Sequence, residues 1–565
     1  MNENRNLLVA FGLSIAIMLG FYQFYEKPRQ DQLIHQKLQE QAMQATQLET
    51  NEKTANVAQV PPPTPEHQAI ENSARITIQN ESLSGSIRQV GAVIDDMLLT
   101  KYTENTDPTS PKIRLLESEN TDHGYSVVSG WKAADNSAVG SMPDEKTNWQ
   151  IQGEHNKLTP EHPIILAWFN DRGIKFERTI SIDNKYLITI NDQVTNHGES
   201  PVAMQAYSQI RRKNPPKSQG FYILHEGPIG YFNNKLFEGS YEDLTKTPVT
   251  QQATNGWFGF TDKFWLVSLI PDSKAVVNID YTFQNGTHIA QFTATPITIK
   301  PGETASYTYK VFAGAKVLSV LDDYEPKIGV PHFDLAVDFG WFYFLTKPLF
   351  YVLEYFHELL GNLGLAILAL TILFKAMLYP MATKSYRSMA RLKNLQPKIQ
   401  QVQSLYKDDR TRQSQELMAL YKKEKVNPAG GCLPVLIQAP IFFCLYKVLF
   451  VSIEMRHAPF FGWIHDLAAP DPTSFANLFG LLPFDVPSFL QIGIWPILMG
   501  ITMVIQQRMN PQPADPAQAK IMMIMPVMFT YLFASFPAGL VVYWTWNNLL
   551  SMAQQWLITK QMSKK

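Results

Sequence analysis

The chain has 565 residues, and its 49 lysines and arginines nearly balance its 50 aspartates and glutamates, so the formal net charge is −1. This balance excludes a protein that holds nucleic acid by bulk charge. The only cysteines are Cys432 and Cys444, so the polar part of the chain has no disulfide framework. That polar part covers residues 27–330, whereas residues 335–560 are dense in large apolar side chains, which excludes a purely soluble protein.

Residues 1–26 contain an uncharged apolar run, Leu7–Tyr25, that is about as long as a bilayer requires. The run ends in aromatic residues rather than in the small residues of a signal-peptide cleavage site. This favours an uncleaved transmembrane anchor over a signal peptide. Residues 27–70 are polar, contain the proline cluster Pro61–Pro65 and are typical of a flexible tether.

Residues 71–330 predict a large all-β domain. Several short runs alternate between apolar and polar residues with a period of two, among them Arg75–Ile78, Lys175–Ile182 and Ala305–Phe312. Turn signals such as Gln284-Asn285-Gly286 separate these runs. The pattern predicts a large antiparallel β-sandwich.

Residues 335–361 contain an apolar stretch that is interrupted by charges. Lys347, Glu354 and Glu358 fall on one stripe of a helix. This arrangement favours an amphipathic helix that lies in the membrane interface, and a true span is the alternative.

Residues 362–560 predict a core of five transmembrane helices, which makes six spans with the anchor. The loop after the first span of this core is rich in lysine and arginine, whereas the loop Glu454–Val486 has one arginine and no lysine. By the positive-inside rule the lysine- and arginine-rich loop is cytoplasmic. Both termini of the chain are then cytoplasmic as well, and residues 27–335 lie outside. The predicted spans are Leu363–Ala382, Leu433–Ile453, Pro487–Gln507, Ile521–Pro537 and Leu540–Leu557.

The basic loop, residues 383–428, predicts a helical hairpin. Apolar residues recur at spacings of three and four from Met389 to Ile399, and the pattern resumes at Leu417. Pro397 is expected to bend the first arm. The cations of the hairpin either serve only as a topology signal or dock an anionic partner such as a ribosome or targeting receptor. The docking candidates are Arg387, Arg391, Lys422 and Lys423.

Lys375 lies near the middle of its predicted span, where a charge costs about 2.5–3.5 kcal/mol. Thr371, Lys375 and Tyr379 are four residues apart, so one face of this helix is polar. A charge in that position usually faces a wet cavity. The alternative is that Lys375 snorkels to the cytoplasmic headgroups.

Other spans also have polar faces. Gln438 lies in the second span of the core, and Tyr543, Asn547 and Ser551 are spaced by four in the last one. With Lys375 they predict a hydrophilic groove between helices, and the alternative is ordinary helix–helix hydrogen bonding. A second intramembrane cation, Lys447, lies nearer the outer end of its span and is expected to snorkel outward.

The chain shows no nucleotide-binding loop, no metal-spaced histidine or cysteine cluster and no nucleophile elbow, so we expect no catalytic residue, metal or cofactor. A secondary transporter or channel with Lys375 on an ion path is the main alternative, although the repeats of such proteins are not evident. An enzymatic alternative would use the β domain to bind or modify sugars, but paired carboxylates at a persuasive spacing are lacking there.

Residues 340–560 contain several short motifs of mixed proline, glycine and polar residues: Asn427–Pro434, Gln438-Ala439-Pro440, Tyr379-Pro380, Leu395–Lys398, Trp463–Leu467, Lys520–Pro526 and Phe536–Leu540. These motifs resemble those of the YidC membrane protein insertases of the YidC/Oxa/Alb family. The anchor, tether and outer β domain resemble, by their layout, the Gram-negative form, whose periplasmic domain is a β-supersandwich.

The resemblance implies an insertase and chaperone of the bacterial inner membrane, with a groove that is open to cytosol and lipid. Lys375 stands where the family often has arginine, Thr371 matches a groove threonine, and Trp544 stands where a groove tyrosine is often found. The implied partners are nascent membrane proteins, the lipid bilayer, the Sec translocon and a ribosome or targeting receptor. The short tail after Lys560 predicts no long ribosome-binding extension.

Overall fold

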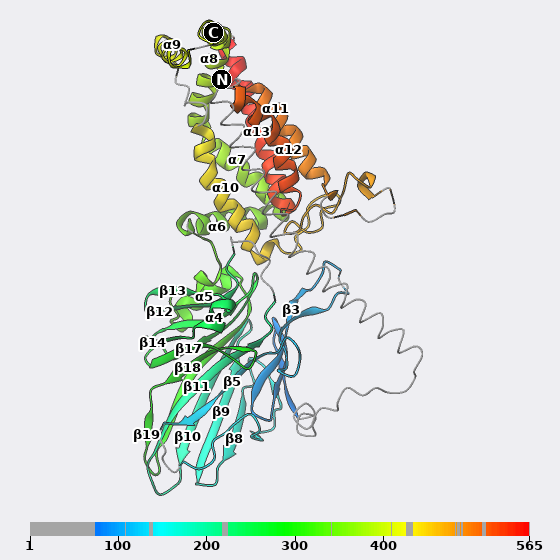
Figure 1. Ribbon diagram of the computed structural model, residues 1–565. Helices are drawn as coiled ribbons and strands as arrows, with labels where there is room; N and C mark the ends of the chain where they lie inside the picture. The colour runs from blue at the N-terminus through cyan, green and yellow to red at the C-terminus, as the bar shows by residue number, and fades with distance from the viewer. Residues whose placement is uncertain are drawn as a thin grey trace, which may run out of the picture. The chain divides into compact units, whose positions relative to one another are not determined.

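The computed structural model describes residues 74–563 except for 108, 135–138, 217–223, 341, 408, 425, 427–432, 481, 483–485, 488–489 and 511–515. The predicted anchor (1–26) and tether (27–70) lie outside the described residues. The chain divides into two compact units, one joining residues 1–71 with 515–521 and the other joining 72–514 with 522–565. The β domain and nearly all of the helices belong to the second unit (Figure 1).

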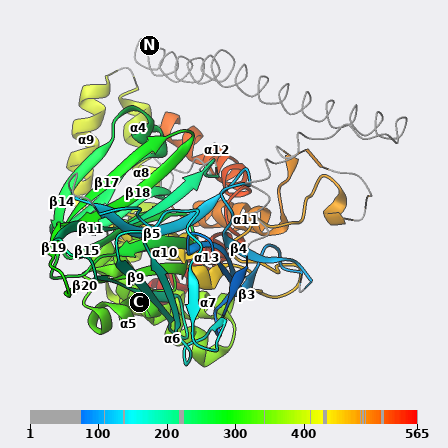
Figure 2. The same cartoon turned by 90° about the horizontal axis from the view of Figure 1, so that it is seen from below.

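The predicted β-sandwich is confirmed as two sheets. The eleven-stranded sheet has the order β14-β17-β18-β11-β5-β3-β2-β1-β7, and β4 and β19 pair with β3 and β11. Figure 2 shows the part of this sheet from β14 to β3. Its strands are β1 (Arg75–Gln79), β2 (Leu83–Arg88), β3 (Val93–Thr103), β4 (Lys112–Leu116), β5 (Tyr125–Ala133), β7 (Lys157–Leu158), β11 (Val202–Lys213), β14 (Val249–Thr254), β17 (Val276–Gln284), β18 (Thr287–Ala294) and β19 (Ile297–Ile299).

The second sheet has nine strands in the order β13-β12-β15-β16-β20-β10-β9-β8-β6. All of its pairings are antiparallel. The strands are β6 (Gln150–Gln152), β8 (Ile164–Phe169), β9 (Ile174–Ile182), β10 (Leu187–Asn196), β12 (Gly227–Phe232), β13 (Lys235–Glu238), β15 (Gly256–Thr261), β16 (Trp265–Ile270) and β20 (Thr304–Ala315).

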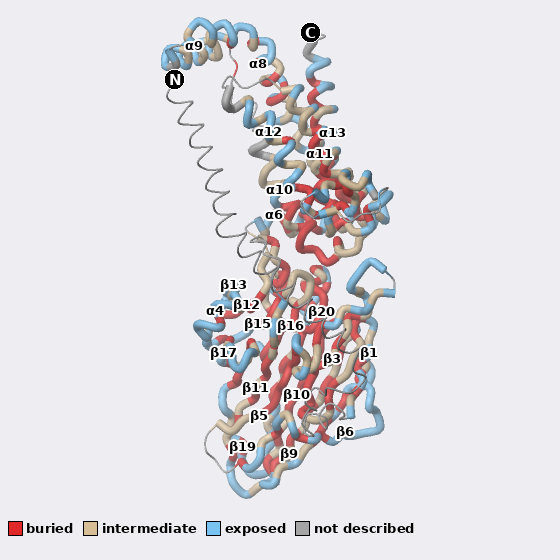
Figure 3. Tube along the Cα trace, turned by 45° about the vertical axis from the view of Figure 1, so that its right-hand side comes forward, coloured by how far each residue is buried: buried red, intermediate tan, exposed pale blue. Residues whose placement is uncertain are grey.

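Alternation of side chains builds the core of the sandwich. In β9 every second residue from Ile174 to Ile182 is buried, as the period of two predicts, and buried residues follow the central strands (Figure 3). The predicted turn between β17 and β18 is a two-residue loop, because Gln284 pairs with Thr287. Asn285 and Gly286 have φ values of 49° and 78°, the left-handed conformation that such a hairpin requires.

One ion pair is fully enclosed by the sandwich. Arg178 donates two hydrogen bonds to Asp192 at 2.6 and 3.0 Å, and both side chains are only 2% exposed. The Tyr309 hydroxyl donates to the same carboxylate at 3.2 Å. The pair lies across neighbouring strands, since Arg178 on β9 is directly opposite Asp192 on β10. Its bidentate geometry compensates the cost of burying both charges.

Most helices follow the β domain in the sequence. Among the described residues they comprise α4 (Tyr241–Lys246), α5 (Leu318–Ile328), η2 (Phe333–Ala336), α6 (Tyr343–Leu360), α7 (Leu363–Met377), α8 (Tyr379–Leu405), α9 (Arg410–Lys423), α10 (Leu433–Val451), η4 (Ile453–Met455), η5 (Leu478–Gly480), α11 (Ile494–Met509), α12 (Pro516–Phe533) and α13 (Ala538–Ser563).

The helix predicted within residues 335–361 is α6. The sequence placed Lys347 on a polar stripe of this helix, but in the structure Lys347 is paired with acidic residues of other elements. The Lys347 ammonium forms ion pairs with Asp322, at 2.9 Å, and with Asp334. The hydroxyls of Tyr343 and Tyr351 donate to the same two carboxylates. These contacts join α6 to α5 and η2, the last helical elements of the β region.

Two predicted apolar segments differ from the helices that form. The segment Leu363–Ala382 breaks at Leu378, where α7 and α8 meet at an angle of 69°. Pro380 lies in the first turn of α8, where proline is well accommodated, and it has no N–H group that could continue the hydrogen bonds of α7 across the break. Among the described residues of the segment Pro487–Gln507, the α-helix begins at Ile494.

Within the part of the chain that the structure describes, no single helix combines the length and apolarity needed to cross a membrane. The bent pair α7–α8 meets those two requirements when both helices are taken together.

The buried pair yields a stability prediction. Arg178→Met should destabilise the β domain by about 3–5 kcal/mol, because Asp192 would remain buried without its counter-charge. The matched control is Arg114→Met, which removes an exposed pair with Asp96 and should cost about 0–1 kcal/mol. Proteolysis of the full-length protein across a urea series measures both values. Equal effects of the two substitutions would contradict the prediction.

Candidate functional site

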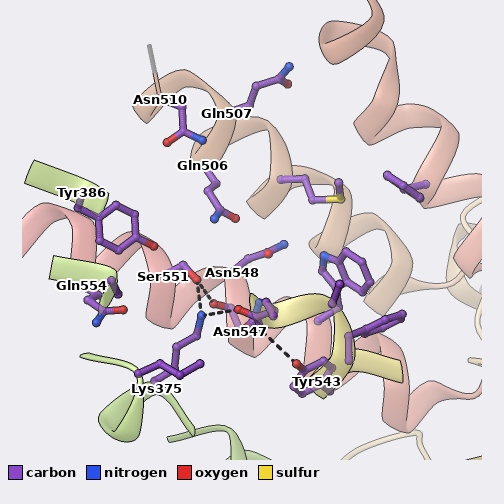
Figure 4. A pocket seen from close by; sticks show the side chains of 18 of the residues that line it. Lys375, Tyr386, Gln506, Gln507, Asn510, Tyr543, Asn547, Asn548, Ser551 and Gln554 are labelled. Atoms are coloured by element: carbon purple, nitrogen blue, oxygen red, sulfur yellow. Dashed lines mark hydrogen bonds between the residues drawn. The ribbon is translucent and has the colours of Figure 1, made fainter. Parts of the chain in front are cut away.

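A cavity of about 490 Å³ lies between α7, α8, α10, α11, α12 and α13 (Figure 4). One part of its lining is polar, and the larger part is apolar, with methionine and aromatic side chains beside leucine, alanine and proline. The polar lining residues are Lys375, Tyr386, Gln438, Gln506, Gln507, Asn510, Tyr543, Asn547, Asn548, Ser551 and Gln554.

Lys375 is the cation of this cavity, and neutral side chains hold it. Its ammonium donates to the Ser551 hydroxyl at 2.8 Å and to the Gln438 amide oxygen at 3.2 Å. Gln438 in turn donates to Asn547 at 2.7 Å and to the Tyr543 hydroxyl at 3.1 Å. Among the described residues, no carboxylate forms an ion pair with Lys375, so its positive charge is not neutralised within the cavity.

The last helix supplies most of the polar partners because of its repeat. Tyr543, Asn547 and Ser551 are four residues apart and therefore share one face of α13, as the sequence predicts. Ser551 also donates to the Asn547 carbonyl at 2.7 Å, which leaves its oxygen lone pairs for Lys375. Three helices, α7, α10 and α13, are thus linked by one continuous hydrogen-bond network.

The opposite wall of the cavity is apolar and adaptable. Trp544 packs against Phe442, with ring centroids 4.7 Å apart, and against Phe533 at 5.0 Å. Met522 and Met525 of α12 continue this wall. Methionine side chains adjust to different apolar shapes, so the wall suits varied apolar partners.

The structure brings five of the seven groove candidates together: Lys375, Gln438, Tyr543, Trp544 and Asn547. The other two do not line the cavity. Thr371 is buried, and its hydroxyl donates to the Ile367 carbonyl at 2.7 Å. Tyr379 is 43% exposed and follows the break at Leu378, so the helical repeat that predicted its position ends before it.

Several lining residues escaped the sequence analysis. Gln506, Gln507 and Asn510 lie at the end of α11, where polar residues are expected to meet water and carry little information. Tyr386 and Asn548 lie within α8 and α13. Gln554 is the exception, because its spacing from Asn547 and Ser551 extends the polar face of α13 and could have identified it. The missed residues are Tyr386, Gln506, Gln507, Asn510, Asn548 and Gln554.

Lys447, the second cation within an apolar helix, has an acidic partner that the sequence analysis did not identify. Its ammonium forms an ion pair with Asp338 at 2.9 Å, and the two side chains are 15% and 18% exposed. Asp338 also accepts the backbone N–H of His225 at 3.0 Å. A carboxylate just before α6 therefore neutralises the charge of Lys447, and its outward snorkelling to the headgroups stays a prediction.

The basic loop forms the predicted helical hairpin from α8 and α9. Leu392, Leu395 and Ile399 are buried together with Val426, and Leu417 packs against them. The helix α8 continues through Pro397. The four docking candidates, Arg387, Arg391, Lys422 and Lys423, are all exposed, so their charges are available to a partner.

Comparison with known proteins assigns the β domain and the helical region to known families. Residues 75–352 match the family model "YidC periplasmic domain", and residues 355–565 match the model "60Kd inner membrane protein". An outer β-sandwich joined to this helical core defines the class of membrane protein insertases.

Whole-length relatives identify the family within this class. The membrane protein insertase YidC of Rickettsia massiliae is 45% identical over 99% of this chain and 100% of its own. That of Brucella suis biovar 1 is 44% identical over 100% of this chain and 97% of its own. The chain therefore belongs to the YidC family, as the sequence motifs predicted.

A crystal structure of an active YidC insertase with its first transmembrane domain resolved is also similar. It covers 85% of this chain and 91% of its own, at 17% identity and a TM-score of 0.34. The family assignment rests on the sequence matches. It makes this protein an inner-membrane insertase whose substrates are nascent membrane proteins, and not an enzyme. The transporter and sugar-modifying alternatives are excluded by the same assignment.

If the cavity contains water, side chains that line its polar part should be accessible to water-soluble reagents. In a background with Cys432→Ser and Cys444→Ser, the variants Gln506→Cys and Asn510→Cys should react rapidly with a water-soluble thiol reagent, since both positions line the polar part. Val448→Cys is the control, because Val448 is 0% exposed. Labelling in inverted membrane vesicles measures the rates. Equally slow reaction at all three positions would show that the cavity is dry.

Proposed function

We propose that the cavity is a hydrophilic groove through which polar segments of client proteins pass during insertion. The observation that carries this proposal is the environment of Lys375, whose charge is held by Ser551 and Gln438 and by no described carboxylate. A charge within an apolar helix bundle is costly unless it is solvated. Water in the groove provides that solvation, and the same water shortens the apolar barrier for a client.

The mechanism needs no covalent chemistry. A hydrophilic client segment enters the groove, where Lys375 attracts its acidic groups and amides such as Asn547 replace part of its hydration. The apolar segment of the client meets the wall of Trp544, Met522 and Met525 and moves from there into lipid. Hydrophobic partition drives this last step, because transfer of apolar surface out of water is favourable.

We propose the following membrane arrangement. The anchor (1–26) and the five predicted core segments make six spans, α6 within residues 335–361 lies in the interface, and residues 362–560 form the insertase core. The hairpin (383–428) and both termini are cytoplasmic. The tether (27–70) and β domain (71–330) are periplasmic. The contrast between the many exposed cations of the hairpin and the single arginine of the loop Glu454–Val486 supports this orientation.

We also propose that the protein works alone or with the Sec translocon, and that it serves as a chaperone during folding. The hairpin would receive clients from a ribosome or a targeting receptor. Its own apolar residues are packed within it, which leaves the basic side chains Arg387, Arg391, Lys422 and Lys423 directed to the surroundings. Such a surface suits an anionic partner.

Substitution of Lys375 tests the groove. Lys375→Met should slow the insertion of clients with acidic translocated segments about fivefold, which corresponds to the loss of one charge interaction of about 1 kcal/mol. Clients with neutral segments should insert at the original rate, because methionine keeps most of the side-chain volume. Protease protection of radiolabelled clients in vesicles measures the two rates.

Two controls separate charge from packing. Lys375→Arg retains the charge and should insert both kinds of client normally. Lys384→Met removes an exposed lysine that does not line the cavity, and it should have no effect. If Lys375→Met leaves acidic clients unaffected at matched expression, the role in charge attraction is wrong.

The hairpin predicts a salt-dependent interaction. Arg387→Gln, Arg391→Gln, Lys422→Gln and Lys423→Gln in combination should weaken ribosome or receptor binding, most strongly at low salt. Each lost phosphate contact should reduce the slope of log affinity against log salt by about one. Sedimentation of the full-length protein with ribosomes across a salt series measures the slope. An unchanged slope would show that the charges act only in topology.

A further inference from the structure

A second, cation-lined pocket lies where the β domain meets the loop after α10. Its volume is about 480 Å³, within the range of about 300–1,000 Å³ that small ligands occupy. One side is lined by residues at the end of β3, and the other by residues of the loop after α10. The lining residues are Lys101, Tyr102, Thr103, Thr106, Arg456, His457, Pro459 and His465. Lys101, Arg456, His457 and His465 are half of its eight lining residues, and no acidic side chain lines it.

Direct contacts fix the two sides of this pocket to each other. The Arg456 guanidinium donates to the carbonyl oxygens of Thr103, at 2.6 Å, and Glu104, at 3.0 Å. It also lies 5.6 Å from the ring centroid of Trp265, which packs edge-on against Tyr102. Because Arg456 contacts both sides, the shape of the pocket is fixed by contacts between distant parts of the chain and does not depend on a single loop.

The charges of the pocket favour an anion. Lys101 and Arg456 carry permanent positive charges. Burial and the neighbouring Arg456 lower the pKa of His457, while Asp466 acts in the opposite direction, so its ring serves mainly as a neutral hydrogen-bond partner. Nearby acids do not line the pocket: Oδ1 of Asp466 accepts the backbone N–H groups of His457, at 3.1 Å, and Ala468, at 2.8 Å, and Glu104 contacts Arg456 through its backbone carbonyl oxygen.

The surroundings point to a lipid as the source of the anion. Phe461 is 58% exposed and Trp463 is 38% exposed, and both belong to the loop that lines the pocket. Exposed aromatic residues next to basic ones are typical of the level of the lipid headgroups. In the proposed orientation this loop faces the outer leaflet, so the inference rests on the proposed function.

We propose that this pocket binds the phosphodiester headgroup of an anionic phospholipid of the outer leaflet. Lys101 and Arg456 pair with the phosphate oxygens, and the Thr106 hydroxyl and the histidine rings of the lining satisfy the remaining polar atoms. The acyl chains extend past Phe461 and Trp463 into the bilayer. A bound lipid would thereby hold the foot of the β domain against the membrane surface.

Photocrosslinking tests the proposal on the full-length protein in vesicles. Photoactivatable phosphatidylglycerol should form adducts within residues 101–106 and 456–465, and photoactivatable phosphatidylcholine should form far fewer. Lys101→Gln should reduce the phosphatidylglycerol adducts about fivefold, since each basic residue near a membrane surface contributes about that factor. Lys274→Gln, an exposed lysine of the same domain outside the pocket, should leave them unchanged.

Four results would overturn the proposal. Equal adducts with both lipids would show that the charge of the lipid is not recognised. Loss of the adducts on addition of inorganic phosphate would assign the pocket to a free anion, and loss on addition of an acidic peptide would assign it to a client. Phe461→Cys, labelled with an impermeant thiol reagent in the Cys432→Ser, Cys444→Ser background, reports the orientation separately. A correct orientation without lipid adducts would refute this inference and leave the proposed function intact.

Discussion

The arrangement of the helical region depends on one requirement, which is that the ammonium group of Lys375 must have hydrogen-bond acceptors. A partly buried cation needs hydrogen-bond acceptors, because leaving it without them costs several kcal/mol. The acceptors come from two other helices, Ser551 on α13 and Gln438 on α10. Gln438 accepts from Lys375 with its oxygen, so its amide nitrogen is free to donate to Tyr543 and Asn547. One charge thereby sets the mutual position of three helices that are distant in the sequence.

The neutrality of these acceptors has a functional consequence. A carboxylate at 3 Å would compensate the charge, and the pair would be a structural contact with a weak external field. Hydroxyl and amide oxygens stabilise the ammonium and leave its net charge in place. The positive potential therefore extends into the cavity, whose remaining polar lining of glutamine and asparagine has no charge of its own. An acidic segment of a client would experience this potential over the whole polar part of the cavity.

Periodicity predicted the parts of the structure that obey a single repeat. Alternation identified β9 and its neighbours, and a spacing of four placed Tyr543, Asn547 and Ser551 on one face of α13. The same rule misplaced Tyr379, because the break at Leu378 interrupts the repeat. Which polar helix ends line the cavity depends on how the helices cross, and one sequence contains no measure of that.

Ion pairs between residues that are far apart in the sequence also could not be predicted from the sequence. Asp338 lies 109 residues before Lys447, so nothing local indicated that the carboxylate neutralises this lysine. The two carboxylates that hold Lys347 are likewise supplied by α5 and η2 rather than by its own helix.

Three lysines within apolar helices, Lys347, Lys375 and Lys447, show how one residue type acquires two roles. Lys347 and Lys447 are each neutralised by aspartates that precede their own helices, and both pairs join the helical region to the end of the β region. Their charges therefore stabilise the fold.

Lys375 has only neutral partners among the described residues, and its charge remains available within a cavity. Removal of a paired lysine leaves a carboxylate unpaired and destabilises the fold, whereas removal of Lys375 leaves neutral groups that water can satisfy. The presence or absence of an acidic partner, rather than depth in an apolar segment, therefore separates the structural lysines from the lysine whose charge remains in the cavity.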